Sequence, residues 1–160
     1  MTRDEEVVYL AGKLHFVREY GGQNKGVWVN TIQKVTGNGD GDSWCASFVS
    51  LVLGIVFEGK SPMPRSASCD VLLEHARGKG WLTETPSVGD VFLILNSPTD
   101  AHHTGFVFRV LPDRVETIEG NSNDDGSSNG DGVYVREGAH ARKLNPAKML
   151  FVHYPRETVA

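Results

Sequence analysis

The sequence predicts an α+β fold in which a helical first half is followed by an antiparallel sheet. Apolar residues recur at helical spacing up to about residue 80, and short apolar runs typical of strands follow from about residue 86. Glycine and proline separate most of these runs. A chain of 160 residues has the length of one domain with a sizeable core. We therefore expect a single domain over residues 1–160, with a helical part over about 1–80 and a sheet part over about 86–155.

Four stretches of the first half are expected to form helices. A capping box at Thr2 and Glu5 precedes the first one, and Gly21-Gly22 follows it. The stretch that begins at Cys45 has its apolar residues on one face and is expected to be largely buried. The expected helices cover residues 7–17, 28–35, 45 to 59 at the latest, and about 68–77.

Five stretches of the second half are expected to form strands. Val91 to Leu95 is a continuous apolar run, as in strands that are buried on both faces. Residues 111–114 are a turn that joins two strands into a hairpin, and residues 121–132 are a polar, glycine-rich loop. The expected strands cover residues 91–95, 105–110, 115–119, 133–136 and 149–154.

Composition limits the classes of function. The formal net charge of -4 and the lack of a basic run give no electrostatic support for binding nucleic acid. No apolar run is long enough to span a membrane, so we expect no membrane insertion. The acidic N-terminus is not a secretory signal, which predicts synthesis in the cytoplasm. The two cysteines are expected to be free thiols, and the protein is expected to be a monomer.

Cys45 is the first candidate for chemistry, because it lies in the first turn of the expected buried helix. Asp42 or Ser43 is expected to cap that helix. Free backbone N–H groups and the helix dipole favour a thiolate there, and a thiolate is the form of cysteine that attacks carbonyl groups. The alternative is an ordinary small core residue. Cys69 has no evident partner and is interpreted as structural.

Of the six histidines, His102 and His103 lie where the chain enters the second expected strand. The register of the hairpin decides which of them faces Glu119 and Asn121 on the next strand, because side chains alternate between faces. A three-residue loop at 111–113 selects His103, and a loop one residue shorter selects His102. Either histidine would lie beside a carboxylate and an amide that can hold its tautomer and stabilise its imidazolium.

Two other interpretations of this strand pair remain open. One is a polar cross-strand pair on a solvated sheet face. The other is a metal site formed by Asp100, His102 and His103, although the sequence has no second ligand cluster at zinc spacing.

Four short segments follow one another along the chain and carry these candidates. They are Trp44-Cys45-Ala46-Ser47-Phe48-Val49, Ser87-Val88-Gly89-Asp90-Val91, His103-Thr104-Gly105-Phe106-Val107 and Ile118-Glu119-Gly120-Asn121. Together, in this order and with these separations, they resemble the CHAP family, the cysteine, histidine-dependent amidohydrolases/peptidases of the papain-like superfamily. Residues 17–26 also resemble the lead-in of many phage and bacterial members.

The resemblance implies a papain-like CHAP fold, with N-terminal helices that carry the cysteine packed on an antiparallel sheet that carries the histidine. It selects His103, and it implies that Glu119 is the third catalytic group and Asn121 a further polar orienter, without ranking the two. It also implies hydrolysis of an amide bond in peptidoglycan, with Cys45 as the nucleophile. Both an N-acetylmuramoyl-L-alanine amidase and a peptide endopeptidase fit this reaction.

Two further expectations concern the neighbourhood of the cysteine. Trp44 is expected to line the substrate groove, with packing in the core as the alternative. Asn38, Asp40 and Asp42 form an oxygen-rich loop, and a similar loop spans 123–131. Such loops can hold calcium, as in some CHAP enzymes, but the same residues also form ordinary turns. We therefore expect a calcium site at the first loop. The expected reaction itself requires no cofactor.

The resemblance implies a protein that acts on the bacterial cell wall after release or delivery, as a phage lysin or a secreted effector. Two other functions remain open: a thiol peptidase that acts on protein, and a catalytically silent domain that binds the wall or forms part of a virion. The presence of Cys45, His103 and Glu119 together argues against the silent domain, because binding alone does not need all three.

Overall fold

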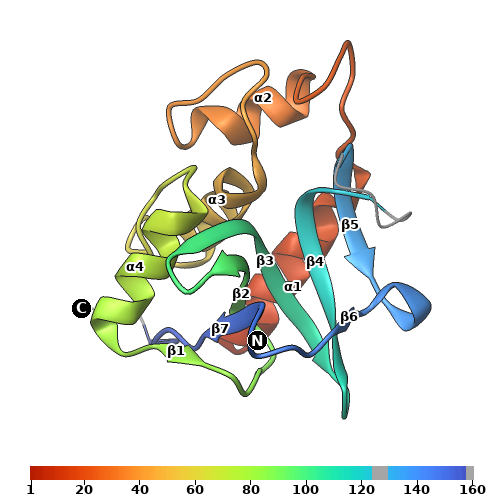
Figure 1. Ribbon diagram of the computed structural model, residues 1–160. Helices are drawn as coiled ribbons and strands as arrows, with labels where there is room; N and C mark the ends of the chain where they lie inside the picture. The colour runs from red at the N-terminus through yellow and green to blue at the C-terminus, as the bar shows by residue number, and fades with distance from the viewer. Residues whose placement is uncertain (124–129, 158–160) are drawn as a thin grey trace.

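The computed structural model describes residues 1–123 and 130–157, where helices precede an antiparallel sheet as the α+β class requires (Figure 1). The α-helices are α1 (Arg3–Lys13), α2 (Val27–Lys34), α3 (Cys45–Val56) and α4 (Cys69–Lys79), and the 3-10 helices are η1 (Leu14–Phe16) and η2 (Gly138–His140). The strands are β1 (Leu82–Thr83), β2 (Val91–Ser97), β3 (Asp100–Val110), β4 (Arg114–Ser122), β5 (Gly132–Arg136), β6 (Arg142–Lys143) and β7 (Met149–Val152). Within the described residues, no helix combines the length and apolar character needed to cross a membrane.

The start of α1 follows its predicted signal, but its end does not: α1 ends at Lys13 and is followed by η1, well before Gly21-Gly22. Thr2 Oγ1 accepts from the N–H of Glu5 at 3.2 Å, and Glu5 Oε2 accepts from the N–H of Thr2 at 2.7 Å, which completes the capping box of α1. The expectation that Asp42 or Ser43 caps α3 is wrong, because the N-cap residue is Trp44, which makes no side-chain cap bond. The carboxylate of Asp42 instead accepts from a backbone N–H of the preceding loop at 3.0 Å.

The sheet is antiparallel, with the strand order β1-β7-β2-β3-β4-β5 and with β6 paired to β4. β3 begins at Asp100, so His102 and His103 lie within the strand and not at its entrance. The sequence does not predict β1 and β6, because strands of two residues are too short to show alternation.

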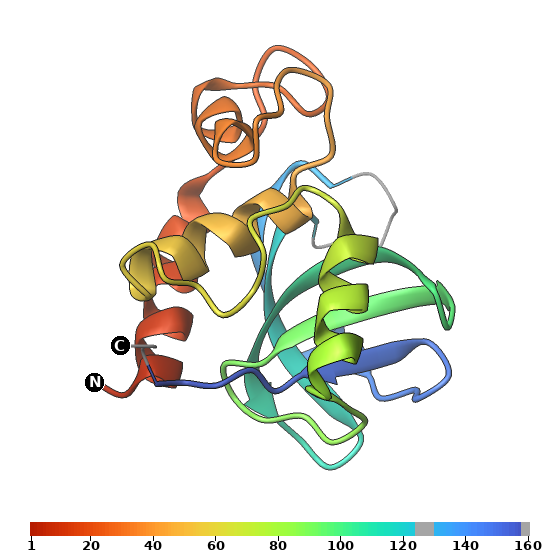
Figure 2. The same cartoon turned by 90° about the vertical axis from the view of Figure 1, so that its left-hand side faces the viewer.

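Helix α3 lies against the sheet and also contacts α1 and α2 (Figure 2). It packs against β3 and β4 of the sheet and against helices α1 and α2. Helix α4 packs separately against β3. In β2, Val91, Leu93 and Leu95 belong to the main core with the helices, whereas Phe92 belongs to a smaller cluster on the opposite face of the sheet. This confirms that β2 is buried on both faces.

The β3–β4 hairpin contains both of the registers that the sequence leaves open. Near the turn Val110 pairs with Val115, which is the register of a two-residue loop. Farther from the turn Val107 pairs with Thr117, which is the register that a three-residue loop predicts. The shift falls between Val107 and Arg109, so one extra residue forms a β-bulge in β3.

This bulge decides which of the two histidines lies on the same face of the sheet as Glu119. A shift of one residue moves every side chain of a strand to the other face. If the register at the turn continued along the strand, His102 would lie on the face of Glu119. Because the bulge intervenes, His103 lies there, as the family resemblance implies.

A glycine in β4 lets the cysteine helix approach the sheet. A methyl group at Gly120 would lie 2.6 Å from Cβ of Phe48 and 3.0 Å from the ring of Trp44, and both of these side chains are fully buried. Such distances are too short for carbon atoms, so the contact requires glycine. Phe48 lies one helical turn after Cys45, and therefore this contact sets how far the cysteine stands from the sheet.

Gly120→Ala is expected to lower the free energy of unfolding by about 1–3 kcal/mol, because the added methyl group must push α3 away from β4. Gly54→Ala is the matched control: Gly54 lies within α3 with open space around it, and alanine should stabilise the helix by about 1 kcal/mol. Urea unfolding followed by circular dichroism measures both changes. Equal stability of Gly120→Ala and the wild-type protein would show that the contact is not tight.

Candidate active site

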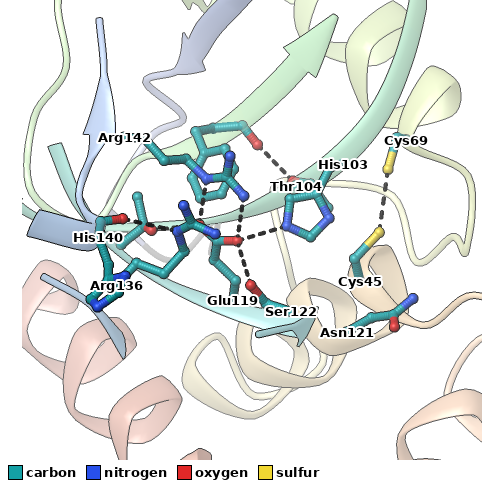
Figure 3. A network of polar contacts seen from close by, with 12 residues as sticks. Cys45, Cys69, His103, Thr104, Glu119, Asn121, Ser122, Arg136, His140 and Arg142 are labelled. Atoms are coloured by element: carbon teal, nitrogen blue, oxygen red, sulfur yellow. Dashed lines mark hydrogen bonds and ion pairs between the residues drawn. The ribbon is translucent and has the colours of Figure 1, made fainter. Parts of the chain in front are cut away.

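Cys45, His103 and Glu119 come together from three elements, α3, β3 and β4 (Figure 3). Nε2 of His103 lies 2.8 Å from Oε1 of Glu119. The other ring nitrogen, Nδ1, faces the Cys45 sulfur, and each group shifts the pKa of the other toward its charged form. In this order of nucleophile, imidazole and carboxylate, a histidine can exchange a proton with the nucleophile while it is held in one orientation.

Glu119 is fully buried, and both of its oxygens accept hydrogen bonds. Arg142 donates from Nε to Oε2 at 2.6 Å and from Nη2 to Oε1 at 2.7 Å. The hydroxyls of Thr117 and Ser122 donate further bonds of 2.5 and 3.0 Å. Burial alone would raise the pKa of this carboxyl, but the hydrogen bonds and charges of Arg142 and His103 hold the pKa well below its ordinary value. Glu119 is therefore an ionised group in a fixed position.

Arg142 is a site residue that the sequence does not reveal. It lies in β6, and its guanidinium stacks 5.4 Å from the centroid of the Phe92 ring. A two-residue strand has no periodicity from which it could be found. The available signal is chemical, because a glutamate on a buried strand needs a cation within reach. Arg136 is a second and more distant cation, with its Nε 3.9 Å from Oε2 of Glu119.

Cys69 is the partner of Cys45, which corrects the interpretation of Cys69 as a structural residue without a partner. The two sulfurs lie 3.7 Å apart, and both side chains are buried. The hydrogen bond from Cys69 is the largest cause that lowers the pKa of Cys45 well below its ordinary value; burial opposes it, and His103 and Ser43 reinforce it. The same bond, burial and the charge of Cys45 raise the pKa of Cys69. These opposite shifts favour a thiolate at Cys45, with Cys69 as the thiol that donates to it.

His103 carries the positive charge that balances this thiolate. Burial favours the neutral ring, but the hydrogen bonds with Cys45 and Glu119 and the charges of both raise the pKa of His103 to about 9. The two shifts together favour a thiolate beside an imidazolium, the form in which cysteine is ready to attack a carbonyl group. The side chain of His103 remains 15% exposed, so a ligand can reach it.

Asn121 has a different contact from the one expected of an orienting group. Its backbone is left-handed, with φ of 52°, a conformation that asparagine adopts more readily than most residues. Its Nδ2 donates to the hydroxyl of Ser43 at 3.2 Å, which ties the end of β4 to the loop before the cysteine. The geometry therefore favours Glu119 over Asn121 as the group that orients His103.

The expectation that Trp44 lines the substrate groove is not supported. Its indole is fully buried, and Nε1 donates to a carboxylate oxygen of Glu19 at 3.1 Å. Trp44 instead packs against the sheet at Gly120, which is the alternative role of a buried aromatic side chain.

The alternative metal site of Asp100, His102 and His103 is not assembled in the structure. His102 is exposed, whereas His103 is bound to Glu119 on the other face of the strand. Across residues 1–123 and 130–157, no three histidine, cysteine, aspartate or glutamate side chains gather into a metal site.

In the predicted calcium loop, side-chain oxygens already accept hydrogen bonds from neighbouring groups of the same segment. Oδ1 of Asn38 accepts from the hydroxyl of Thr36 at 2.9 Å, and Oδ2 of Asp42 accepts from the N–H of Gly39 at 3.0 Å. These are the contacts of an ordinary turn. Calcium at this loop stays a prediction. Most of the second oxygen-rich loop, residues 124–129, lies outside the described residues.

Comparison with known proteins gives no match: no family model, no curated protein and no solved structure matches the chain. The resemblance to the CHAP family therefore stays a prediction that rests on the four sequence segments. Three of its expected catalytic residues, Cys45, His103 and Glu119, lie together in one site.

Cys69→Ala is expected to raise the pKa of Cys45, because the largest cause of the lowered value is removed. The pH dependence of alkylation by iodoacetamide, followed at Cys45 by peptide mass spectrometry, measures this pKa. Cys69→Ser is the matched control, since its hydroxyl keeps a donor in place and should retain part of the shift. An unchanged alkylation profile in Cys69→Ala would show that Cys69 does not stabilise the thiolate.

Glu119→Gln is expected to lower the pKa of His103 from about 9 toward its ordinary value of about 6.5, because the neighbouring negative charge is lost. NMR titration of the imidazole signals measures the change. Glu116→Gln is the matched control: Glu116 is also a buried carboxylate of β4, but it accepts from the N–H of Gly138 at 2.8 Å. Equal shifts in the two variants would contradict a direct effect of Glu119.

Proposed function

We propose that the protein is a cysteine-dependent amide hydrolase that cleaves bacterial peptidoglycan. The proposal is carried by one observation, a cysteine at the start of α3 that lies beside a histidine held by a buried carboxylate. Burying charges has a desolvation cost of several kcal/mol per ion, given as an order of magnitude. A cysteine that only filled the core would need none of these charges, so the network supports a catalytic role for Cys45 over a packing role.

The proposed reaction has two halves. In the first, the thiolate of Cys45 attacks the carbonyl carbon of the amide, and the imidazolium of His103 gives its proton to the nitrogen as the C–N bond breaks. An acyl thioester remains on Cys45. In the second half, neutral His103 takes a proton from water, which attacks the thioester and releases the carboxylic acid. The thiolate and the imidazolium are then restored.

Two other groups support these steps. Glu119 holds Nε2 of His103, so that Nδ1 stays directed at the sulfur, and its charge stabilises the imidazolium. The backbone N–H of Cys45 lies at the positive end of α3 and is the proposed donor to the oxyanion. The N-cap residue Trp44 makes no side-chain cap bond, so its side chain does not occupy the donors of this turn.

The substrate class and the finer fold assignment rest on the family resemblance. Helices that carry the cysteine and pack on an antiparallel sheet that carries the histidine support a papain-like CHAP fold. Both an N-acetylmuramoyl-L-alanine amidase and a peptide endopeptidase are compatible with the mechanism, since each breaks an amide bond. The proposed setting is the cell wall, reached after release or delivery as a phage lysin or a secreted effector.

Purified wild-type protein incubated with purified peptidoglycan should release soluble fragments, and Cys45→Ala should lower their yield by about a thousandfold or more. Mass spectrometry of the fragments separates the amidase from the endopeptidase by the new chain ends. His103→Ala should abolish release, whereas His102→Ala is the matched control that should leave it unchanged, because His102 is exposed on the other face of β3.

Equal fragment yields from wild type and Cys45→Ala would contradict the cysteine mechanism. If several wall types yield no fragments with the wild-type protein, peptidoglycan is excluded as the substrate. Hydrolysis of labelled casein would then identify a thiol peptidase, and sedimentation with intact cell walls in the absence of hydrolysis would identify a binding domain.

A further inference from the structure

Cys45 and Cys69 form a pair of thiols at the starts of two helices. Each is the first residue of its helix, α3 and α4, and their sulfurs lie 3.7 Å apart. The sequence contains these two cysteines and no others, so each is the other's one possible thiol partner within this chain. The sulfurs of a disulfide lie about 2.05 Å apart, so an approach of roughly 1.7 Å would bring the pair to bonding distance.

Contacts on both sides of Cys69 hold it beside the nucleophile. Ser50 of α3 and Ser66 exchange two hydrogen bonds of 3.2 and 3.1 Å, which fix the segment before α4 to α3. Asp70 accepts from the N–H of Ala101 at 2.7 Å, which fixes the first turn of α4 to β3. The closeness of the two sulfurs is thus built by three elements and does not depend on a covalent bond.

The protonation states of the two sulfurs suit oxidation followed by disulfide formation. The thiolate of Cys45 is the form that reacts with peroxides. The hydrogen bond with Cys45, the burial of Cys69 and the charge of Cys45 together raise the pKa of Cys69. Cys69 therefore stays a thiol while Cys45 is ionised. Oxidation of Cys45 to a neutral group removes the charge and the thiolate acceptor, so two of these causes are lost and Cys69 becomes easier to deprotonate.

We propose that this pair is an oxidative modification site, at which a peroxide oxidises Cys45 and Cys69 converts the product into an intramolecular disulfide. In the first step the sulfur of Cys45 attacks a peroxide oxygen, the O–O bond breaks, and the leaving oxygen takes the proton of His103. Cys45 is then a sulfenic acid. In the second step Cys69 passes its proton to neutral His103, its sulfur attacks that of Cys45, and the S–O bond breaks.

The departing hydroxide takes this proton from His103 and leaves as water. With hydrogen peroxide as oxidant, two thiols and one peroxide give one disulfide and two water molecules. The sulfurs together lose two electrons, and the peroxide gains them. The disulfide blocks the nucleophile and protects it from the irreversible sulfinic and sulfonic acids, and a thiol reductant restores it. The loss of hydrolysis rests on the proposed function, but the formation of the disulfide does not.

The test is a titration of the reduced wild-type protein with hydrogen peroxide, followed by mass spectrometry of the intact chain and its peptides. The expected product has lost the mass of two hydrogen atoms, contains a cross-link between the peptides of Cys45 and Cys69, and is reversed by dithiothreitol. Hydrolysis of peptidoglycan should be lost as the cross-link forms and should return on reduction. A cross-link in a protein that never hydrolyses peptidoglycan would overturn the proposed function and support the modification site.

Cys69→Ala and Cys69→Ser are the controls, and two substitutions are used so that misfolding of one does not decide the result. Both lack the second thiol, so Cys45 should proceed to sulfinic and sulfonic acids that dithiothreitol does not reverse. The proposal is overturned if wild-type Cys45 reaches these acids as fast as the variants do while Cys69 stays a free thiol. Pairing of cysteines only between molecules, seen on non-reducing gels, would overturn it as well.

Discussion

The carboxylate of Glu119 is a fully buried charge. Hydrogen bonds from β4 and its neighbouring strands take the place of the water that would otherwise solvate it. Arg142 brings the opposite charge from β6, and two hydroxyls of β4 and the ring of His103 complete the shell. Leaving such a charge without partners would cost several kcal/mol, as an order of magnitude. The shell therefore cannot loosen without destabilising the sheet. His103 derives both its orientation and its raised pKa from this buried ion.

The surroundings of the Cys45 sulfur depend on where helices meet the sheet. Gly120 brings α3 close to β4, and α4 brings a second thiol to the same point. The helix end, the imidazolium and the thiol each favour the anionic sulfur, and they come from separate parts of the chain. The site is thus a property of how these elements pack, and no single segment contains it.

Local and periodic features of this fold are predictable from the sequence, whereas contacts made through space are not. The capping box of α1, the doubly buried β2 and the place of Cys45 at a helix start follow from spacing alone. The choice between His102 and His103 does not, because a one-residue bulge leaves no pattern in the sequence. Cys69 and Arg142 were missed for a related reason: each reaches the site from an element whose packing no local signal encodes.

Because of the bulge in β3, the two ends of this hairpin respond differently to the insertion or deletion of a residue. Between the bulge and the turn, an insertion or deletion alters the loop register, and a compensating change at the bulge can leave His103 in place. Between His103 and the bulge, the loss of one residue exchanges the two faces of the strand and brings His102 to the carboxylate. Sequence length should therefore drift at the tip of this hairpin and stay constant at its base.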